Sequence, residues 1–355
     1  MAPWSPGSRV VVIGAGATRG AQFVEDGKPP LCLPPLNTDF FTQLQRIRAA
    51  KHERDVENVL NDVLTLYGPN FDLTLEQYFT QLEAMIATIE ASSSSTVKFS
   101  VERLRSMRTR LLNGLSAVLE QSADVAKATS KPRTSPCQYH AKVVELLDPK
   151  DTIISFNYDC VIDHALRTSG GGKWSARYGY CFPNPDRVEG SVTWDAANPP
   201  DRHNRSINLL KLHGSLNWFP FPPNDAQPIR LRERPYKQAG NKEYEIIPPE
   251  YVKSFHERPI FKQLWTNAEL AIRKAQTLAL IGFSFTPTDL HVEALFRVAL
   301  ADRPALEHIL IVNPSHEHRQ RIRSVLTAAL GKGARVTQFD RFRDAYPHLP
   351  ELLSS

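Results

Sequence analysis

The sequence of 355 residues lacks several features that define other classes of protein. It has only four cysteines, and no two of them have the CxxC spacing of a zinc ribbon or a redox dithiol. It contains no apolar run of about 18 residues, the length that a membrane helix needs, and no N-terminal segment typical of a signal peptide. We therefore expect a cytoplasmic protein with no membrane segment, no zinc module and free cysteine thiols.

The composition is that of an ordinary globular protein. Hydrophobic residues make up 41% of the chain and charged residues 23%, enough for one large core or two modest ones. The formal charge is +5, with arginine-rich stretches at 103–110, 230–234 and 319–323. Such stretches can attract nucleic acid or an acidic partner, but we interpret them as solvated helix faces and loops.

Five short apolar runs are each followed by a small or polar residue. The runs are residues 9–13, 152–156, 209–212, 277–281 and 308–312, and the residues that follow them are Gly14, Asn157, His213, Gly282 and Asn313. Runs of this kind are typical of buried parallel strands. Ligands of an open parallel sheet bind beyond the carboxyl ends of its strands, so these positions predict a single crevice.

A long helical segment separates the first two of these strands. Between about 41 and 130, apolar residues recur with helical spacing. The segments 169–205 and 220–249 are rich in glycine, proline and aromatic residues and predict long loops. We therefore predict one domain over residues 1–355, an α/β fold with a Rossmann-like, doubly wound parallel sheet and a large helical insertion.

The first strand end has the features of a phosphate-binding turn. Gly14-Ala15-Gly16 follows a buried strand, and glycine lets the backbone approach a pyrophosphate closely. The full GxGxxG pattern does not fit, because the residue three past Gly16 is Arg19. No second strand follows about twenty residues later to supply an acidic ribose ligand. A dehydrogenase of the usual Rossmann type is therefore disfavoured.

Two further strand ends have side chains suited to catalysis. Asn157 and Asp159 offer an amide and a carboxylate two residues apart, and the alternative interpretation is an Asx turn that caps a helix beginning near Val161. His213, before Gly214, offers an imidazole, the side chain that most often acts as a general base. A single histidine is more often structural than catalytic. The shared position at strand ends favours catalysis here.

The order of the motifs GAGA, SFNYD, KLHGSLNW, IGFSFTPTD and LIVN resembles that of the sirtuin family. Specifically, it resembles the sirtuin-like NAD-hydrolysing branch found in bacterial antiphage defence systems. The resemblance covers about residues 9–339, apart from the detail of the helical insertion. It implies NAD as the substrate and cleavage of the glycosidic bond to nicotinamide, a chemistry that requires no metal.

The resemblance implies chemical roles for three residues. Asn157 would contact the nicotinamide ribose and its attacking water. Asp159 would hold the carboxamide. His213 would be the general base that acts on a ribose hydroxyl or on water.

The resemblance also implies residues that bind the rest of NAD. The pyrophosphate and the adenosine ribose would contact small or polar residues at three strand ends, namely Gly14, Ala15, Gly16, Gly282, Ser284 and Asn313. Asp289 and His291 would support the loop that carries Ser284, and we expect neither to be catalytic.

Departures from the protein-deacylating sirtuins favour hydrolysis. The deacylase pattern has a glutamine before the catalytic asparagine, a four-cysteine zinc module, and a strand after the histidine that pairs with an acyl-lysine peptide. This chain has Phe156, no cysteine cluster, and Leu216-Asn217-Trp218 instead. We therefore expect an NAD glycohydrolase that uses water as the acceptor and produces nicotinamide and ADP-ribose.

The resemblance further implies a role in abortive defence by NAD depletion. The chain ends shortly after a last predicted strand at 335–339, so we expect regulation by a partner, such as a HerA-type ATPase or a short argonaute protein. Self-assembly through the helical insertion is also expected, with nucleic acid reached only through a partner. The alternatives are an NAD-dependent protein deacylase, a non-catalytic module that binds NAD or ADP-ribose, and a nucleic-acid-processing subunit.

Overall fold

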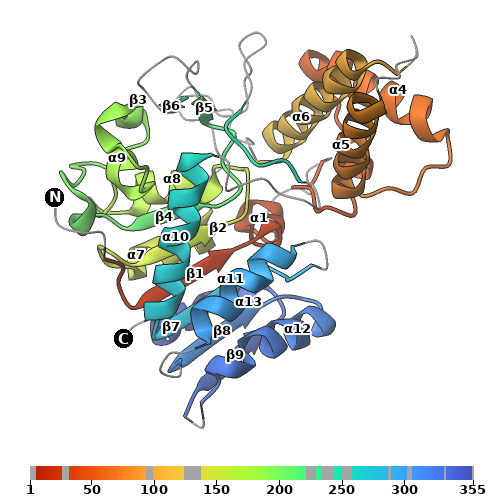
Figure 1. The fold of residues 1–355 in the computed structure, drawn as a ribbon. Coiled ribbons are helices and arrows are strands. Elements are labelled where there is room, and N and C mark those ends of the chain that lie inside the picture. Colours follow the sequence, from red (N-terminus) through yellow and green to blue (C-terminus); the bar gives the residue numbers. More distant parts are fainter. Residues whose placement is uncertain are drawn as a thin grey trace.

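Six parallel strands form the central sheet of the computed structural model (Figure 1). They are β1 (Arg9–Ile13), β2 (Thr152–Ser155), β4 (Asn208–Lys211), β7 (Thr277–Ile281), β8 (His308–Val312) and β9 (Arg335–Phe339). Their order across the sheet is β4-β2-β1-β7-β8-β9, the strand order of a Rossmann fold. The predicted doubly wound α/β fold is therefore confirmed.

The structure describes most of the chain. The described ranges are 5–25, 32–92, 99–123, 137–220, 229–232, 244–249, 258–286, 289–301, 306–331 and 333–353. Among these residues, no helix combines the length and the apolar composition that crossing a bilayer requires.

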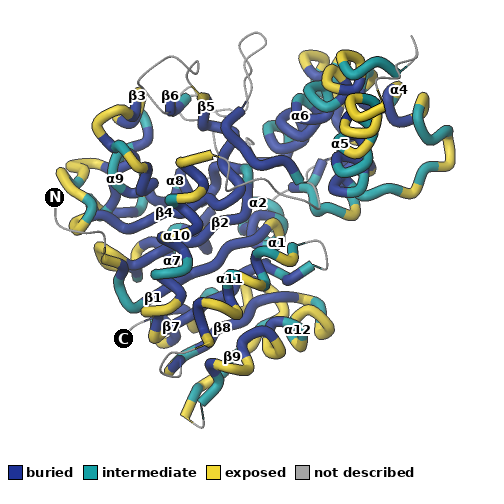
Figure 2. Tube along the Cα trace, in the orientation of Figure 1, coloured by how far each residue is buried: buried dark blue, intermediate teal, exposed yellow. Residues whose placement is uncertain are grey.

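Five of the strands are largely buried because both faces of the sheet are covered there, whereas the edge strand β9 has no buried residue. Val12 of β1 lies opposite Ile154 of β2 on one side and Leu280 of β7 on the other, and none of the three is exposed. Figure 2 shows the central strands as buried along their length. One large hydrophobic core runs through the sheet and its helices.

Helices cover both faces of the sheet. α7 (Gln138–Leu146), α8 (Val161–Ser169) and the C-terminal α14 (Leu349–Leu353) pack together on one face. α10 (Pro259–Lys274), α11 (Leu290–Leu300) and α12 (His316–Leu326) pack in succession on the other (Figure 1). Right-handed crossovers on either side of β1 produce this arrangement. The short helices α1 (Ala15–Arg19), α2 (Gln22–Glu25) and α13 (Phe342–Ala345) complete the sheet domain.

The helical insertion between β1 and β2 has a hydrophobic core of its own. It consists of α3 (Phe40–Leu44), α4 (Glu53–Tyr67), α5 (Leu75–Ser92) and α6 (Val101–Ala123). This core includes Leu216 and Phe219, which follow β4. Ser116 of α6 also hydrogen-bonds Tyr244, with 2.9 Å between the two hydroxyl oxygens. The insertion is therefore anchored to segments at the carboxyl edge of the sheet.

The two segments predicted as long loops contain short regular elements. These are α9 (Ala176–Gly179), β3 (Val188–Glu189) and β6 (Ile229–Leu231). Strands β3 and β6 form a three-stranded sheet with β5 (Trp218–Pro220), which ends where the second segment begins. Strand β6 runs parallel to β3 and antiparallel to β5. The fully buried tryptophans Trp174, Trp194 and Trp218 give this region a core. Single turns of 3-10 helix lie at Ala50–His52, Pro185–Arg187, Ser191–Thr193, His203–Arg205, Thr327–Ala329 and Tyr346–His348.

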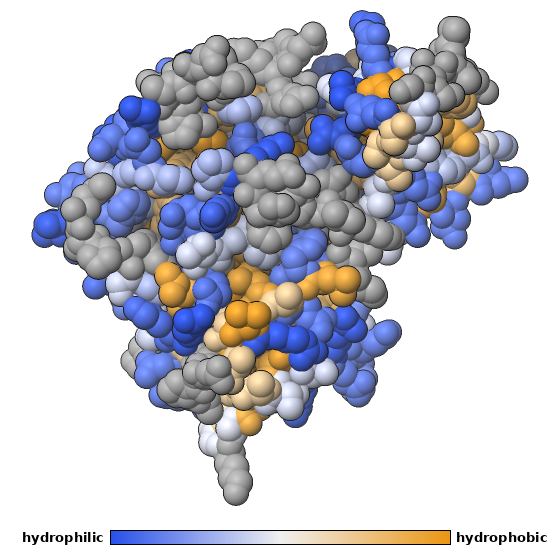
Figure 3. Space-filling view, viewed as in Figure 1, coloured by the Kyte–Doolittle hydropathy of each residue, from blue (hydrophilic) through white to orange (hydrophobic). Residues whose placement is uncertain are grey.

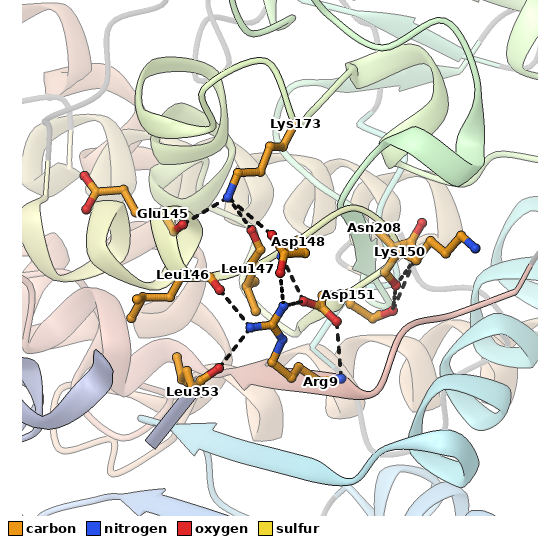
Figure 4. A network of polar contacts seen from close by, with 11 residues as sticks. Arg9, Glu145, Leu146, Leu147, Asp148, Lys150, Asp151, Lys173, Asn208 and Leu353 are labelled. Atoms are coloured by element: carbon orange, nitrogen blue, oxygen red, sulfur yellow. Dashed lines mark hydrogen bonds and ion pairs between the residues drawn. The ribbon is translucent and has the colours of Figure 1, made fainter. Parts of the chain in front are cut away.

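An arginine clasp closes the amino edge of the sheet (Figure 4). The guanidinium of Arg9 donates to the carbonyl oxygens of Leu146 and Leu353, each at 3.0 Å. It also forms ion pairs with Asp148 and Asp151, each at 2.6 Å. The hydrogen bond from Arg9 lowers the pKa of Asp148, whereas burial raises that of Asp151. These contacts join the starts of β1 and β2 to the end of α14.

Helix α11 has an apolar stripe on its outer side. Leu290, Ala294 and Val298 are spaced four residues apart and all are exposed, Leu290 by 66% and Val298 by 63%. Figure 3 shows apolar side chains gathered over this helix. Such stripes are typical of surfaces that contact other proteins. The expected homo-oligomer stays a prediction.

Candidate functional site

Three residues predicted from the sequence lie side by side at the carboxyl edge of the sheet, because β1, β2 and β4 are neighbours. The amide Nδ2 of Asn157 donates to the carbonyl oxygen of Gly14, at 3.1 Å. The ring of His213 contacts both sequence neighbours of Asn157, with centroids 5.1 Å from Phe156 and 6.3 Å from Tyr158. The structure therefore brings Gly14, Asn157 and His213 into one row.

The Asn157 side chain is buried, and its hydrogen bonds fix its orientation. Nδ2 donates to the Gly14 carbonyl and also to Oγ1 of Thr18, at 3.2 Å. Because both partners accept hydrogen bonds, the amide nitrogen must face them. The amide oxygen is buried and has no hydrogen-bond partner among the described residues. Such acceptors are rare in native proteins, so this oxygen is suited to a donor from a ligand or water.

Asp159 hydrogen-bonds protein groups through both carboxylate oxygens. Its Oδ2 accepts from the hydroxyl of Thr18 at 2.8 Å, and its Oδ1 accepts from the backbone N–H of Val161 at 3.0 Å. The second contact is the Asx turn that the sequence left open as an alternative. Burial raises the pKa of Asp159, although the charge of Lys211 opposes this rise. Its contact with the carboxamide stays a prediction.

The segment that contains Glu245 and Ile247, between β6 and α10, packs against His213. The carbonyl oxygen of His213 accepts from the N–H of Ile247 at 2.9 Å, and the Tyr158 hydroxyl donates to the carbonyl of Ile247 at 2.8 Å. Gly214 has φ +79°, and a Cβ there would lie 2.2 Å from the carbonyl oxygen of Glu245. Only glycine fits so close an approach. The segment therefore fixes the loops on either side of the imidazole.

Aromatic rings extend from His213 towards β7. Phe156 contacts the imidazole and also Phe283, with 4.9 Å between the two phenyl centroids and 30° between their planes. Phe283 in turn contacts Phe285 edge-on at 5.0 Å. These rings form an apolar strip from His213, after β4, to the loop after β7.

The predicted phosphate turn packs against the turn after β7. The N–H of Gly16 donates to the carbonyl oxygen of Gly282 at 2.9 Å, and a Cβ on Gly14 would lie 2.6 Å from the same oxygen. Gly282 has φ +60°, and its Cβ would lie 1.9 Å from the backbone nitrogen of Ala17. These glycines let the two turns meet. Contact of Gly14, Gly16 and the exposed Ala15 with pyrophosphate stays a prediction.

Asn313 holds the loop that follows β7. Its Nδ2 donates to the carbonyl oxygen of Phe283 at 2.9 Å, and its Oδ1 accepts from the N–H of Ser315 at 2.9 Å. The amide therefore fixes the backbone beside Ser284, which is half-buried. Direct contact of Gly282, Ser284 or Asn313 with NAD stays a prediction.

The two residues expected to support this loop lie at the start of α11. Oδ2 of Asp289 accepts from the hydroxyl of Thr286 at 3.1 Å, a contact with the loop itself. The ring of His291 instead contacts Trp265 of α10 at 5.9 Å. The indole of Trp265 donates to the carbonyl of Leu212 at 3.2 Å, so α10 is tied to the residue before His213.

Comparison with known families decides what kind of domain this is. The family model of the SIR2-like domain matches residues 151–330, just over half of the chain. The chain belongs to the SIR2-like family. The matched residues of the SIR2-like domain include Asn157, Asp159, His213 and Gly282. Membership indicates NAD use and NAD-dependent enzyme activity in general. A search of curated proteins found no significant match.

Among the described residues, no group of three or more histidine, cysteine, aspartate or glutamate side chains is placed to hold a metal ion. The cysteines Cys32, Cys137, Cys160 and Cys181 are buried and not joined in disulfides.

Two polar residues that contact Asn157 or Asp159 were not predicted from the sequence. Thr18 lies one helical turn after Gly14, and that spacing beside a strand-end turn was the available signal. Lys211 contacts the carbonyl oxygen of Asp159 at 2.6 Å. A lysine that interrupts an apolar strand was its signal, because a buried lysine needs a partner.

Proposed function

We propose that this SIR2-like chain is an NAD glycohydrolase that cleaves NAD to nicotinamide and ADP-ribose with water as the acceptor. The observation that carries the proposal is the buried amide oxygen of Asn157, which has no partner among the described residues and lies in one row with His213. The row stands at the carboxyl edge of a Rossmann-like sheet, where such folds bind nucleotides. Family membership supports NAD as the ligand.

The proposed reaction requires one hydrogen-bond acceptor that positions the attacking water and one general base. As the bond between ribose and nicotinamide breaks, its electron pair leaves with nicotinamide, and the ribose carbon develops oxocarbenium character. Asn157 Oδ1 holds the attacking water through a hydrogen bond. The imidazole of His213 takes the proton that this water loses as the new C–O bond forms.

The aromatic rings beside the row suit the nicotinamide end of NAD. Phe156 and Phe283 form an apolar surface next to the imidazole. A flat aromatic ring stacks favourably on such a surface. The rings also lower the local dielectric, which strengthens the hydrogen bonds made to the reacting ribose.

Strand β5 supports water over acyl-lysine as the acceptor. A peptide substrate would pair with the strand that follows the histidine, but β5 has backbone partners on both sides. β6 pairs with one edge, and the carbonyl oxygen of Trp218 accepts from the N–H of Glu245 at 2.9 Å. A peptide would have to displace this contact.

The proposed biological role is that of an effector in antiphage defence, which depletes NAD once infection is sensed. The motif order described from the sequence supports this role. A HerA-type ATPase, a short argonaute protein or further copies of the chain would supply the control.

The test is incubation of the purified chain with NAD, with and without an acyl-lysine peptide, in each assembly state that size-exclusion chromatography separates. We expect equimolar nicotinamide and ADP-ribose without the peptide. Turnover that requires the peptide would establish a deacylase instead. NAD binding without turnover in every assembly state would establish a binding module.

A further inference from the structure

A lysine with no exposed surface lies at the end of β4. The Nζ of Lys211 donates to the carbonyl oxygen of Asp159 at 2.6 Å and forms an ion pair with Oδ2 of Asp163 on α8 at 3.0 Å. Neither side chain of the pair is exposed. Burial is the largest single influence and lowers the pKa of Lys211, but Asp163, Cys160 and Asp159 together raise it above its usual value. The lysine is therefore charged at neutral pH.

The ion pair belongs to a connected set of buried polar side chains. Oδ1 of Asp163 accepts a hydrogen bond from the hydroxyl of Tyr180. That hydroxyl accepts in turn from Nδ2 of Asn217, at 3.1 Å. None of the four residues is exposed. We call Lys211, Asp163, Tyr180 and Asn217 the Lys211 network.

Stability alone does not account for the Lys211 network. Removing an ammonium and a carboxylate from water is costly, and apolar side chains of similar volume often stabilise a protein at least as well. Buried polar groups do fix one arrangement of the segments that they join, because each donor needs an acceptor at a set distance and angle.

The segments joined here are the two loops that carry Asn157 and His213. The Asp159 carbonyl lies two residues after Asn157, and Lys211 lies two residues before His213. Asn217 lies four residues after His213 and holds the far end of that loop through the tyrosine hydroxyl. One ammonium group thus connects the ends of β2 and β4.

We propose that Lys211, paired with Asp163, is a positioning residue that sets the separation of Asn157 and His213 for the reaction on NAD. The role rests on the proposed function, because that function assigns the chemistry to these two residues. Lys211 acts through the backbone carbonyl of Asp159, to which its ammonium donates, and through strand β4, to which Lys211 itself belongs.

The test replaces the ion pair as a unit. The double variant Lys211→Met/Asp163→Leu removes both charges of the ion pair, so Asp163 is not left as a buried carboxylate without its cation. Asp159 keeps the hydrogen bonds from Thr18 and from the N–H of Val161, so the double variant is expected to fold. Lys211→Met alone buries the Asp163 carboxylate without its cation and is expected to fold poorly. Asn208→Ala is the matched control on the same strand, because Asn208 is buried and its Nδ2 donates to the Lys150 carbonyl at the opposite end, at 2.8 Å.

Two measurements on the full chain report the result. In the double variant we expect backbone amides of 157–160 and 213–217 to exchange at least about 10-fold faster, while β7 and β8 stay protected. We expect kcat for NAD to fall at least about 10-fold with KM within about 3-fold, because misplaced groups slow chemistry more than binding. Asn208→Ala should leave the exchange of both loops and kcat at wild-type values.

A folded double variant with wild-type loop exchange and kcat would overturn the proposal, as would a change in KM alone. If the double variant does not fold, Asn217→Leu gives the same reading: faster exchange in 213–217 supports the proposal and unchanged exchange overturns it. Failure of the proposed function is a separate result. In a wild-type chain that does not hydrolyse NAD, loop exchange still decides whether Lys211 sets the arrangement.

Discussion

Asn157 and Asp159 are two residues apart after the same strand, yet their side chains differ in the hydrogen bonds they already make. Both oxygens of Asp159 accept from protein groups, whereas Oδ1 of Asn157 has no partner among the described residues. The sequence could predict that both lie at a strand end. It could not separate their roles, because the difference depends on Thr18, a residue about 140 positions away whose hydroxyl contacts both.

The first prediction concerns these strand-end residues. Asn157→Ala and His213→Ala should each lower the rate of nicotinamide release by about 10²- to 10⁴-fold, the usual contribution of a positioned acceptor or base. Asn61→Ala, on the exposed side of α4, should match the wild type. Initial rates followed by chromatography measure the effect, and unfolding curves verify the fold. Wild-type rates in both site variants would mean that the assignment is wrong.

A second prediction at this scale concerns pH. Complete burial lowers the pKa of His140 to about 3, from 6.5. As pH falls below 6.5, the unfolded chain binds a proton that the folded chain excludes until about pH 3. The contribution of His140 to the free energy of unfolding is therefore fully present above pH 6.5. It is lost towards pH 3, by up to about 1.4 kcal/mol per pH unit. The free energy of unfolding, measured with urea between pH 4 and 7, should change less steeply with pH in His140→Leu than in the wild type. The control is His316→Leu, at an exposed position, which should keep the pH dependence of the wild type. The same pH dependence of the free energy of unfolding in all three proteins would contradict the account.

At the scale of elements, predictability depended on length. Five of the six strands of the main sheet contain runs of buried apolar residues, so their burial on both faces was readable from the sequence. The edge strand β9 is the exception, because none of its residues is buried. The strands β3, β5 and β6 have only two or three residues each and show no period. They form because Trp194 and Trp218 bury their rings there, and the indole of Trp194 donates to the Arg232 carbonyl at 2.8 Å. Contacts between such distant segments leave no local pattern.

The meeting of two glycine turns gives a third prediction. Gly282→Ala should destabilise the chain by at least about 3 kcal/mol, because the new Cβ would overlap the backbone of Ala17. Gly171 also has a positive φ, +55°, but nothing lies within 4 Å of its Cβ position. Gly171→Ala should therefore cost only about 1 kcal/mol, the penalty of the left-handed backbone. Equal losses in denaturant unfolding would show that the two turns are not tightly packed.

At the scale of the whole molecule, the fold class was predictable but the strand order was not. The sequence predicted that the carboxyl ends of five strands line one crevice, and strands meet in this way only in a parallel sheet. The neighbours of β1 are β2 and β7, which lie more than 100 residues further along the chain. Pairings over such separations depend on the packing of all the helices at once. The Arg9 clasp shows this, because it joins the first strand to the last helix.

The fourth prediction tests that clasp. Arg9→Gln should destabilise the chain by about 3–5 kcal/mol, because Asp151, only 3% exposed, loses its cation. The control is Arg335→Gln, which removes an exposed ion pair between β9 and Glu351 of α14. Exposed pairs contribute little, so this variant should unfold like the wild type. Similar denaturant midpoints for the two variants would contradict a structural role for the clasp.

The central claim is that the row of Gly14, Asn157 and His213 binds NAD. A crystal structure of the wild-type chain with ADP-ribose, the proposed product, tests it most directly. We predict that the terminal ribose lies within hydrogen-bond distance of Asn157 Oδ1, below about 3.5 Å, and beside the His213 ring. The pyrophosphate should lie next to the turn after β1. A ligand bound elsewhere, with Asn157 Oδ1 still lacking a donor, would contradict the account.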